Sequence, residues 1–177
     1  TVDTGAGADN LTMNAKSLGD LDIKSTDALT MNLAVQGSLQ NVTVVTGGGN
    51  DDLSVTATGN MQQVNFDVAN GENKIYLVAG EDHTTDVTLG SEIDSLTSNS
   101  GAGYDSITAK TGAVLNDVEF DTGSSVNPNV DNVKFYATGD VGNIAINAAF
   151  ALTLDMRIAG SAKDLTLNTG DGNDDIT

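Results

Sequence analysis

A short motif of glycine and aspartate returns four times along the chain and constrains its fold more than any other feature. The pattern is Thr or Ser, Gly, any residue, Gly, any residue, Asp, any residue, and Leu or Ile. Its copies occupy residues 4–11, 46–53, 100–107 and 169–176. Internal repetition is the signature of proteins that stack one small structural unit many times. We therefore expect a chain built from repeated coils.

A second element also recurs, in which a Gly is followed five or six residues later by an aliphatic residue that begins a short strand. Clear copies occupy residues 37–42, 59–64, 139–144 and 160–165. The residues that follow alternate between apolar and polar, which is the pattern of a strand with one buried face. These strands begin about every 22 residues. We expect their inward side chains to form one stack, made of Ile23, Val44, Phe66, Phe120, Ile146 and Leu167.

Short strands separated by Gly, Asp and Asn turns predict an all-β fold, a parallel β-solenoid (β-helix) of about seven to eight coils of ~22 residues. Strands ~4.8 Å apart would give a rod roughly 34 Å long. A β-sandwich also has short strands and frequent turns, but it does not explain the recurring distance from Gly to the aliphatic residue. We interpret residues 1–177 as a single solenoid segment of a longer repetitive protein, with loop insertions near 80–94 and 124–130.

Most acidic residues of the chain are aspartates, and this composition limits the classes of ligand and partner that we expect. Of the 25 acidic residues, 21 are Asp, and the formal net charge is −18. Asp in glycine-rich turns supplies the oxygen ligands that hard cations prefer. The seven basic residues are scattered singly, which argues against a nucleic acid partner. The chain has no Cys for disulfides or thiolate sites and no apolar run of ~18 residues for membrane insertion.

The first motif resembles the calcium-binding nonapeptide repeat of RTX proteins, and the composition resembles that of calcium-dependent bacterial surface-layer (S-layer) proteins. The resemblance implies turns in which backbone carbonyls and Asp carboxylates surround Ca²⁺, with Gly allowing the positive φ angles. The implied metal-site residues are Gly5, Gly7, Asp9, Gly47, Gly49, Asp51, Gly101, Gly103, Asp105, Gly170, Gly172 and Asp174, with Asp52 and Asp175 as additional surface ligands. No two of these copies fall on adjacent coils. Turns of this composition also form without metal, through side-chain hydrogen bonds to the backbone.

The resemblance implies a structural module of a secreted bacterial cell-surface or S-layer protein, stabilised or assembled by calcium. Its expected partners are other copies of itself, neighbouring repeat domains or a cell-surface polysaccharide. The alternatives are a repeat stalk of an RTX-like adhesin and a β-helix carbohydrate-active enzyme domain. We assign no catalytic residues. His83 falls in the first expected insertion and is read as a solvated side chain. Arg157 is expected to point outward and to pair with Asp155 or with an acidic residue of another coil.

Overall fold

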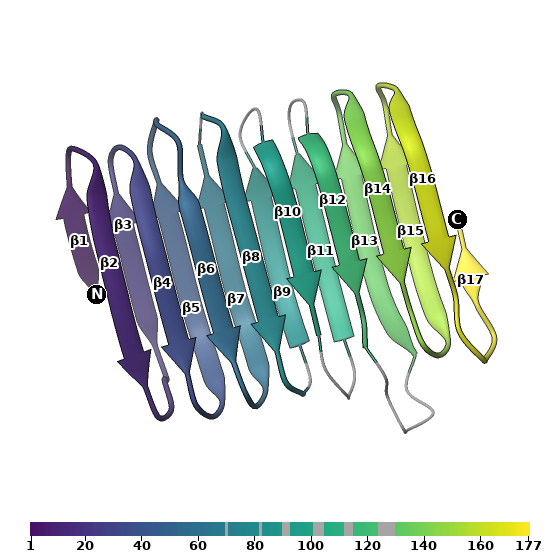
Figure 1. The fold of residues 1–177 in the computed structure, drawn as a ribbon, viewed down its shortest axis with the longest axis horizontal. Coiled ribbons are helices and arrows are strands. Elements are labelled where there is room, and N and C mark those ends of the chain that lie inside the picture. The colour runs from purple at the N-terminus through teal and green to yellow at the C-terminus, as the bar shows by residue number, and fades with distance from the viewer. Residues whose placement is uncertain (70, 82, 90–92, 101–104, 112–114, 124–129) are drawn as a thin grey trace.

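The chain forms two parallel β-sheets that face one another along a flattened solenoid (Figure 1). The computed structural model describes residues 1–69, 71–81, 83–89, 93–100, 105–111, 115–123 and 130–177. Every regular element in these residues is a strand, and they contain no helix long and apolar enough to cross a membrane. The predicted parallel β-solenoid of about seven to eight coils of ~22 residues is confirmed.

Successive strands alternate between the two sheets. One sheet holds, in spatial order, β1 (Val2–Gly5), β3 (Leu21–Ser25), β5 (Leu39–Thr46), β7 (Met61–Val68), β9 (His83–Leu89), β11 (Asp105–Thr111), β13 (Asp131–Ala137), β15 (Leu152–Ile158) and β17 (Asp175–Ile176). The other sheet holds β2 (Asp9–Ala15), β4 (Leu29–Val35), β6 (Asp52–Ala57), β8 (Asn73–Ala79), β10 (Ile93–Asn99), β12 (Leu115–Asp121), β14 (Val141–Asn147) and β16 (Ala162–Asn168). We call them the odd sheet and the even sheet. One coil consists of one strand of the odd sheet and one strand of the even sheet.

The core lies between the sheets, where alternating residues of every strand point inward. Strands such as β3 alternate strictly between buried and exposed positions. The inward residues form two stacks, which corrects the expectation of a single one. Ile23, Val44 and Phe66 stack in the odd sheet. Phe120, Ile146 and Leu167 stack in the even sheet.

The reason for the two stacks is a half-coil shift in the sequence repeat. Residues 83–89, placed within the expected insertion at 80–94, form β9, which pairs with β7 on one side and β11 on the other. The prediction of a loop insertion there was therefore wrong. An additional strand between β8 and β10 moves the later copies of both motifs to the opposite sheet and the opposite edge of the solenoid.

The second expected insertion, 124–130, lies in the connection from β12 to β13. Val118 faces Ile144, 26 positions later, whereas Leu96 faces Val118, 22 positions later. The coil that contains this connection is accordingly the longer one. Residues 124–129 lie outside the described residues, so their conformation is not part of the fold given above.

The second sequence element corresponds to an additional residue near the start of the strand, which shifts the register of β7 against β9 between Met61 and Val64. In β5, Gln40 and Asn41 are consecutive exposed residues, and Asn41 has a φ of 50°. Gln63 in β7 has a φ of 52° at the same place. Two consecutive exposed residues also stand near the start of β12, at 116 and 117. This additional residue is part of the five- or six-residue spacing that separates the Gly from the aliphatic residue.

Candidate calcium-binding turns

The four glycine–aspartate motifs lie at two different edges of the solenoid (Figure 1). The first two lead from the odd sheet to the even sheet, at the β1–β2 and β5–β6 connections. The last two lead from the even sheet to the odd sheet, at the β10–β11 and β16–β17 connections. No two motif turns stand on adjacent coils of one edge, so the structure does not bring these four turns together.

The glycines of the motif have conformations or neighbours that other residues tolerate poorly. The second glycine has a positive φ in each described copy, at 118° for Gly7, 121° for Gly49 and 141° for Gly172. A Cβ on Gly47 would lie 1.9 Å from the carbonyl oxygen of Thr26 in the preceding coil. Of the other predicted glycines, Gly5 has a φ of 78°, Gly170 lies against the Ala149 backbone, and Gly101 and Gly103 are outside the described residues.

The motif aspartate of the second copy is a buried link between coils. Asp51 is only 2% exposed, and its Oδ1 accepts a hydrogen bond of 2.7 Å from the backbone N–H of Leu29. Its Oδ2 accepts one of 2.6 Å from the hydroxyl of Thr46. Burial raises the pKa of Asp51, against the opposing effect of these two hydrogen bonds. Both oxygens of this carboxylate are therefore satisfied within the protein.

Aspartates at the other edge make the same link. Asp105 Oδ1 accepts a hydrogen bond of 3.0 Å from the backbone N–H of His83, and Asp174 Oδ1 accepts one of 2.9 Å from that of Leu152. Asp105 is fully buried. In each case the aspartate begins a coil and binds the backbone that begins the strand one coil earlier. Three of the predicted carboxylates thus have one structural role at two edges.

Two residues with this role were missed from the sequence. Asp131 Oδ1 accepts from the backbone N–H of Asp105 at 3.2 Å, and Asn73 Oδ1 accepts from that of Asp51 at 2.9 Å. Burial raises the pKa of Asp131, against the opposing effect of its hydrogen bond from the backbone N–H of Asp105. Asn73 follows Gly71 by two residues, the same spacing as in the motif, and Gly71 has a φ of 147°. That spacing was the sequence signal by which Asn73 could have been predicted.

The additional ligands predicted beside the motif aspartates point away from them. Asp52 is exposed on the outer face of β6, while the preceding Asp51 is buried. Asp175 is exposed in β17. Successive residues of a strand project to opposite faces, so neither side chain is placed to share an ion with its neighbour.

The first turn has the donor set that best fits a hard cation. The Oδ2 atom of Asp9 is buried and has no hydrogen-bond partner among the described residues. In the next coil, Asp27 Oδ2 accepts a hydrogen bond of 2.9 Å from the backbone N–H of Gly7. Carboxylates from two adjacent coils therefore border one glycine turn. Asp27 was not predicted as a site residue, because its own turn contains no glycine.

Side chains alone do not complete a metal site. In the part of the chain that the structure describes, no group of three or more His, Asp or Glu side chains could together hold an ion. Ca²⁺ takes 6–8 oxygen ligands, so at the first turn Asp9 and Asp27 would need carbonyl oxygens and water to complete the set.

His83 lies inside the core, which corrects its assignment to a solvated loop. It begins β9 and is fully buried. The hydroxyl of Thr85 contacts its Nε2, and the hydroxyl of Ser98 lies 3.5 Å from its Nδ1. Burial lowers the pKa of His83 to about 4. The imidazole is therefore neutral near pH 7.

Comparisons with protein-family models, with curated proteins and with solved structures found no match to this chain.

Proposed function

We propose that this chain is a structural module of a secreted bacterial cell-surface protein of the S-layer kind. The observation that carries the proposal is the continuous parallel register of both sheets, from β1 to β17 and from β2 to β16. Such a stack is joined by backbone hydrogen bonds from each coil to the next. Buried aspartates add a second set of links between coils, as Asp51 does to Leu29.

Calcium is the proposed cofactor, and the first turn is its proposed site. The buried Oδ2 of Asp9 lacks a partner among the described residues, and Asp27 reaches the same turn from the next coil. When bound, Ca²⁺ would neutralise these carboxylates and join the first two coils. Asp51 needs no ion in its present arrangement, because Thr46 and Leu29 already satisfy it. We therefore propose fewer ions than the number of motif copies.

The proposed partners are further solenoid coils or other copies of the chain. Further coils would continue the parallel pairing of both sheets, which runs from β1 to β17 in one and from β2 to β16 in the other.

Electron microscopy with calcium and with EDTA tests this function. The proposal expects an ordered two-dimensional lattice in millimolar Ca²⁺ and the loss of that lattice in EDTA. Single, unassociated rods in both conditions would favour the adhesin stalk instead. Cleavage of uronate polymers by the purified chain would favour the carbohydrate-active enzyme.

A further inference from the structure

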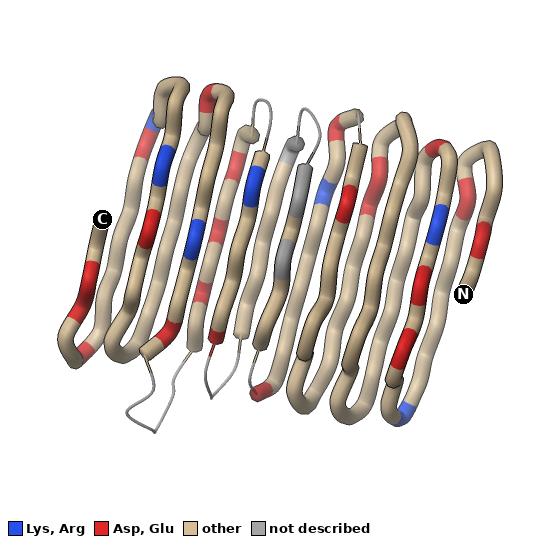
Figure 2. Tube along the Cα trace, turned by 180° about the vertical axis from the view of Figure 1, so that it is seen from behind, with Lys and Arg blue, Asp and Glu red and all other residues tan. Residues whose placement is uncertain are grey.

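The two outer faces of the same coils carry opposite charge. On β11, β13 and β15 the outward side chains include three cations, Lys110, Lys134 and Arg157, against one carboxylate, Asp155. The whole chain has only seven Lys and Arg and a net charge of −18. Figure 2 shows three of these basic positions on neighbouring strands of this face, toward the C-terminal end. We call Lys110, Lys134 and Arg157, with Tyr136 among them, the basic patch.

Two side chains of the basic patch, those of Tyr136 and Arg157, are held in place by contacts with Asp155 and with each other. Lys110, Tyr136 and Arg157 face one another in register across the three strands. The Tyr136 hydroxyl donates to Asp155 Oδ2 at 2.7 Å, and Arg157 donates to both Asp155 oxygens at 3.0 Å. The Arg157 guanidinium lies 5.4 Å from the centre of the Tyr136 ring. Arg157 pairs with Asp155, one of the two alternatives that the sequence predicted, yet its side chain remains 72% exposed.

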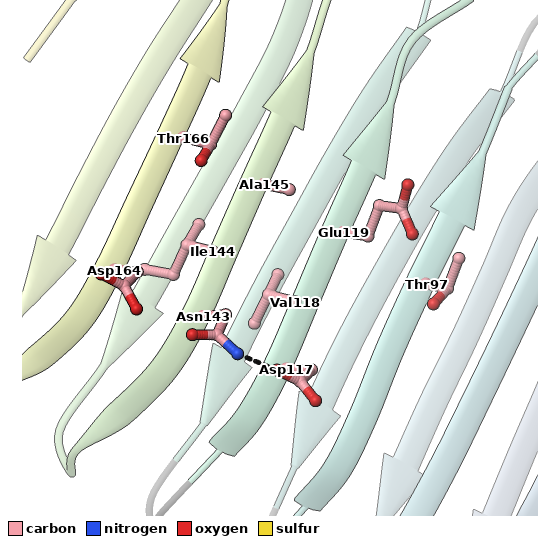
Figure 3. A pocket seen from close by; sticks show the side chains of 9 residues that line it. All are labelled: Thr97, Asp117, Val118, Glu119, Asn143, Ile144, Ala145, Asp164 and Thr166. Atoms are coloured by element: carbon pink, nitrogen blue, oxygen red, sulfur yellow. Dashed lines mark hydrogen bonds between the residues drawn. The ribbon is translucent and has the colours of Figure 1, made fainter.

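The other face of these coils is acidic and hollowed (Figure 3). On β12, β14 and β16 four carboxylates stand against one ammonium group, that of Lys163. A shallow hollow of about 440 Å³ is lined by Asp117, Glu119, Asn143 and Asp164, with Thr97 and Thr166 also bordering it. Asn143 donates to Asp117 Oδ1 at 2.8 Å. We call it the acidic hollow.

We infer that the basic patch of one copy docks on the acidic hollow of a second copy. Lys110 and Arg157 are two strands apart, and so are Asp117 and Asp164. Each pair therefore spans about 9–10 Å, because strands in a sheet lie ~4.8 Å apart. The opposed groups match in charge and in spacing. The inference deepens the proposed function, since it supplies a contact through which a structural module assembles.

The contact joins different surfaces of the two copies. Because the basic patch and the acidic hollow lie on opposite faces of the same coils, each bound copy still presents a free surface of each kind. Heterologous contacts of this type continue as open stacks unless the geometry closes them into a ring. Copies would then stack sheet against sheet, across the solenoid axis and not along it.

Paired charge reversals test the contact in EDTA, where calcium-driven assembly is removed. Sedimentation velocity at ~0.1 M salt should show the mass of the wild-type chain rising with protein concentration. Lys110→Glu with Lys134→Glu, and separately Asp117→Lys with Asp164→Lys, should each weaken self-association at least about tenfold. An equal mixture of the two variants should associate again, because the acidified patch of the first variant can dock on the basic hollow of the second. The unchanged basic patch of the second variant can likewise dock on the unchanged acidic hollow of the first.

The controls change the same number of charges elsewhere. Lys16→Glu with Lys24→Glu matches the first variant, and Asp22→Lys with Asp67→Lys matches the second. Both controls should associate like the wild type, and circular dichroism should show all variants folded. A wild-type chain that stays monomeric, or an unrescued mixture, would overturn the inference. So would a basic patch that binds polygalacturonate in place of a second copy, which would identify an anionic polysaccharide as its occupant.

Discussion

The carboxylate of Asp51 accepts a hydrogen bond of 2.7 Å from the backbone N–H of Leu29, one coil earlier in the solenoid. The same relationship joins Asp105 to His83 and Asp174 to Leu152 at the opposite edge. The motif aspartate therefore links coils directly in this structure. An ion is proposed only where such a carboxylate oxygen lacks a partner, as at Asp9.

Replacing Asp51 by Ala should destabilise the fold by about 2–3 kcal/mol in EDTA. The substitution leaves the Leu29 N–H and the Thr46 hydroxyl without their acceptor inside the protein. Urea unfolding followed by circular dichroism measures the change. Asp52→Ala is the matched control, because Asp52 is exposed and should shift stability by less than about 0.5 kcal/mol. Equal effects from the two substitutions would contradict this role for Asp51.

Two adjacent glycines should respond differently to the same substitution. Gly49→Ala should cost at least about 1–3 kcal/mol, because Gly49 has a φ of 121° and a Cβ would meet the Ala28 nitrogen at 2.8 Å. Gly48→Ala should be close to neutral, since nothing lies within 4 Å of its Cβ position. Thermal melting of both variants makes the comparison. A Gly49→Ala variant as stable as Gly48→Ala would show that this turn is not packed as described.

Acid should destabilise the core through His83. The pKa of His83 is about 4 in the folded chain, against 6.5 for an unperturbed side chain, so the unfolded state binds the proton more readily. The contribution of neutral His83 is complete above pH 6.5 and is lost as the pH falls from 6.5 to 4. The loss amounts to at most about 3 kcal/mol.

His83→Met isolates this effect, because Met61 occupies the facing position one coil earlier. The variant should lose less stability than the wild type between pH 6.5 and 4, as measured by urea unfolding. The raised pKa values of Asp51 and Asp131 act in the opposite direction, since the folded chain then holds a proton more readily than the unfolded chain. Both proteins keep these aspartates, so the difference between them reports on His83. Identical pH profiles would contradict its burial.

The fold was predictable because period, alternation and turn composition all indicate a stacked parallel sheet. The phase of the repeat, meaning which sheet and which edge each copy of a motif occupies, was not predictable. Both sheets have the same apolar–polar alternation, and both edges use the same turn residues. A motif that moves from one edge to the other therefore changes nothing in the sequence pattern except that one additional strand is present. That strand, β9, begins with His83 and contains Thr85 at a buried position, and such polar inward residues gave it the appearance of a loop.

The site was predictable at the level of residue type and less so at the level of contacts. Asp51 and Asp105 stand out from their glycine spacing, and both prove to be buried inter-coil links. Asp131 follows a longer connection without that spacing, and Asp27 matters only through its contact with Gly7 in the preceding coil. The opposite charges of the two faces depend on which strands share a sheet. The sequence spacing alone placed the later strands half a coil out of phase, so these faces could not be predicted from it.

Calcium titration followed by thermal melting tests the central claim most directly. The account predicts that the melting temperature rises with Ca²⁺ but not with equal Mg²⁺, and that EDTA reverses the rise. Asp9→Asn combined with Asp27→Asn should abolish most of the rise, whereas Asp52→Asn combined with Asp175→Asn should preserve it. A melting temperature that is independent of Ca²⁺, or a rise that survives the loss of both Asp9 and Asp27, would contradict the proposed calcium site.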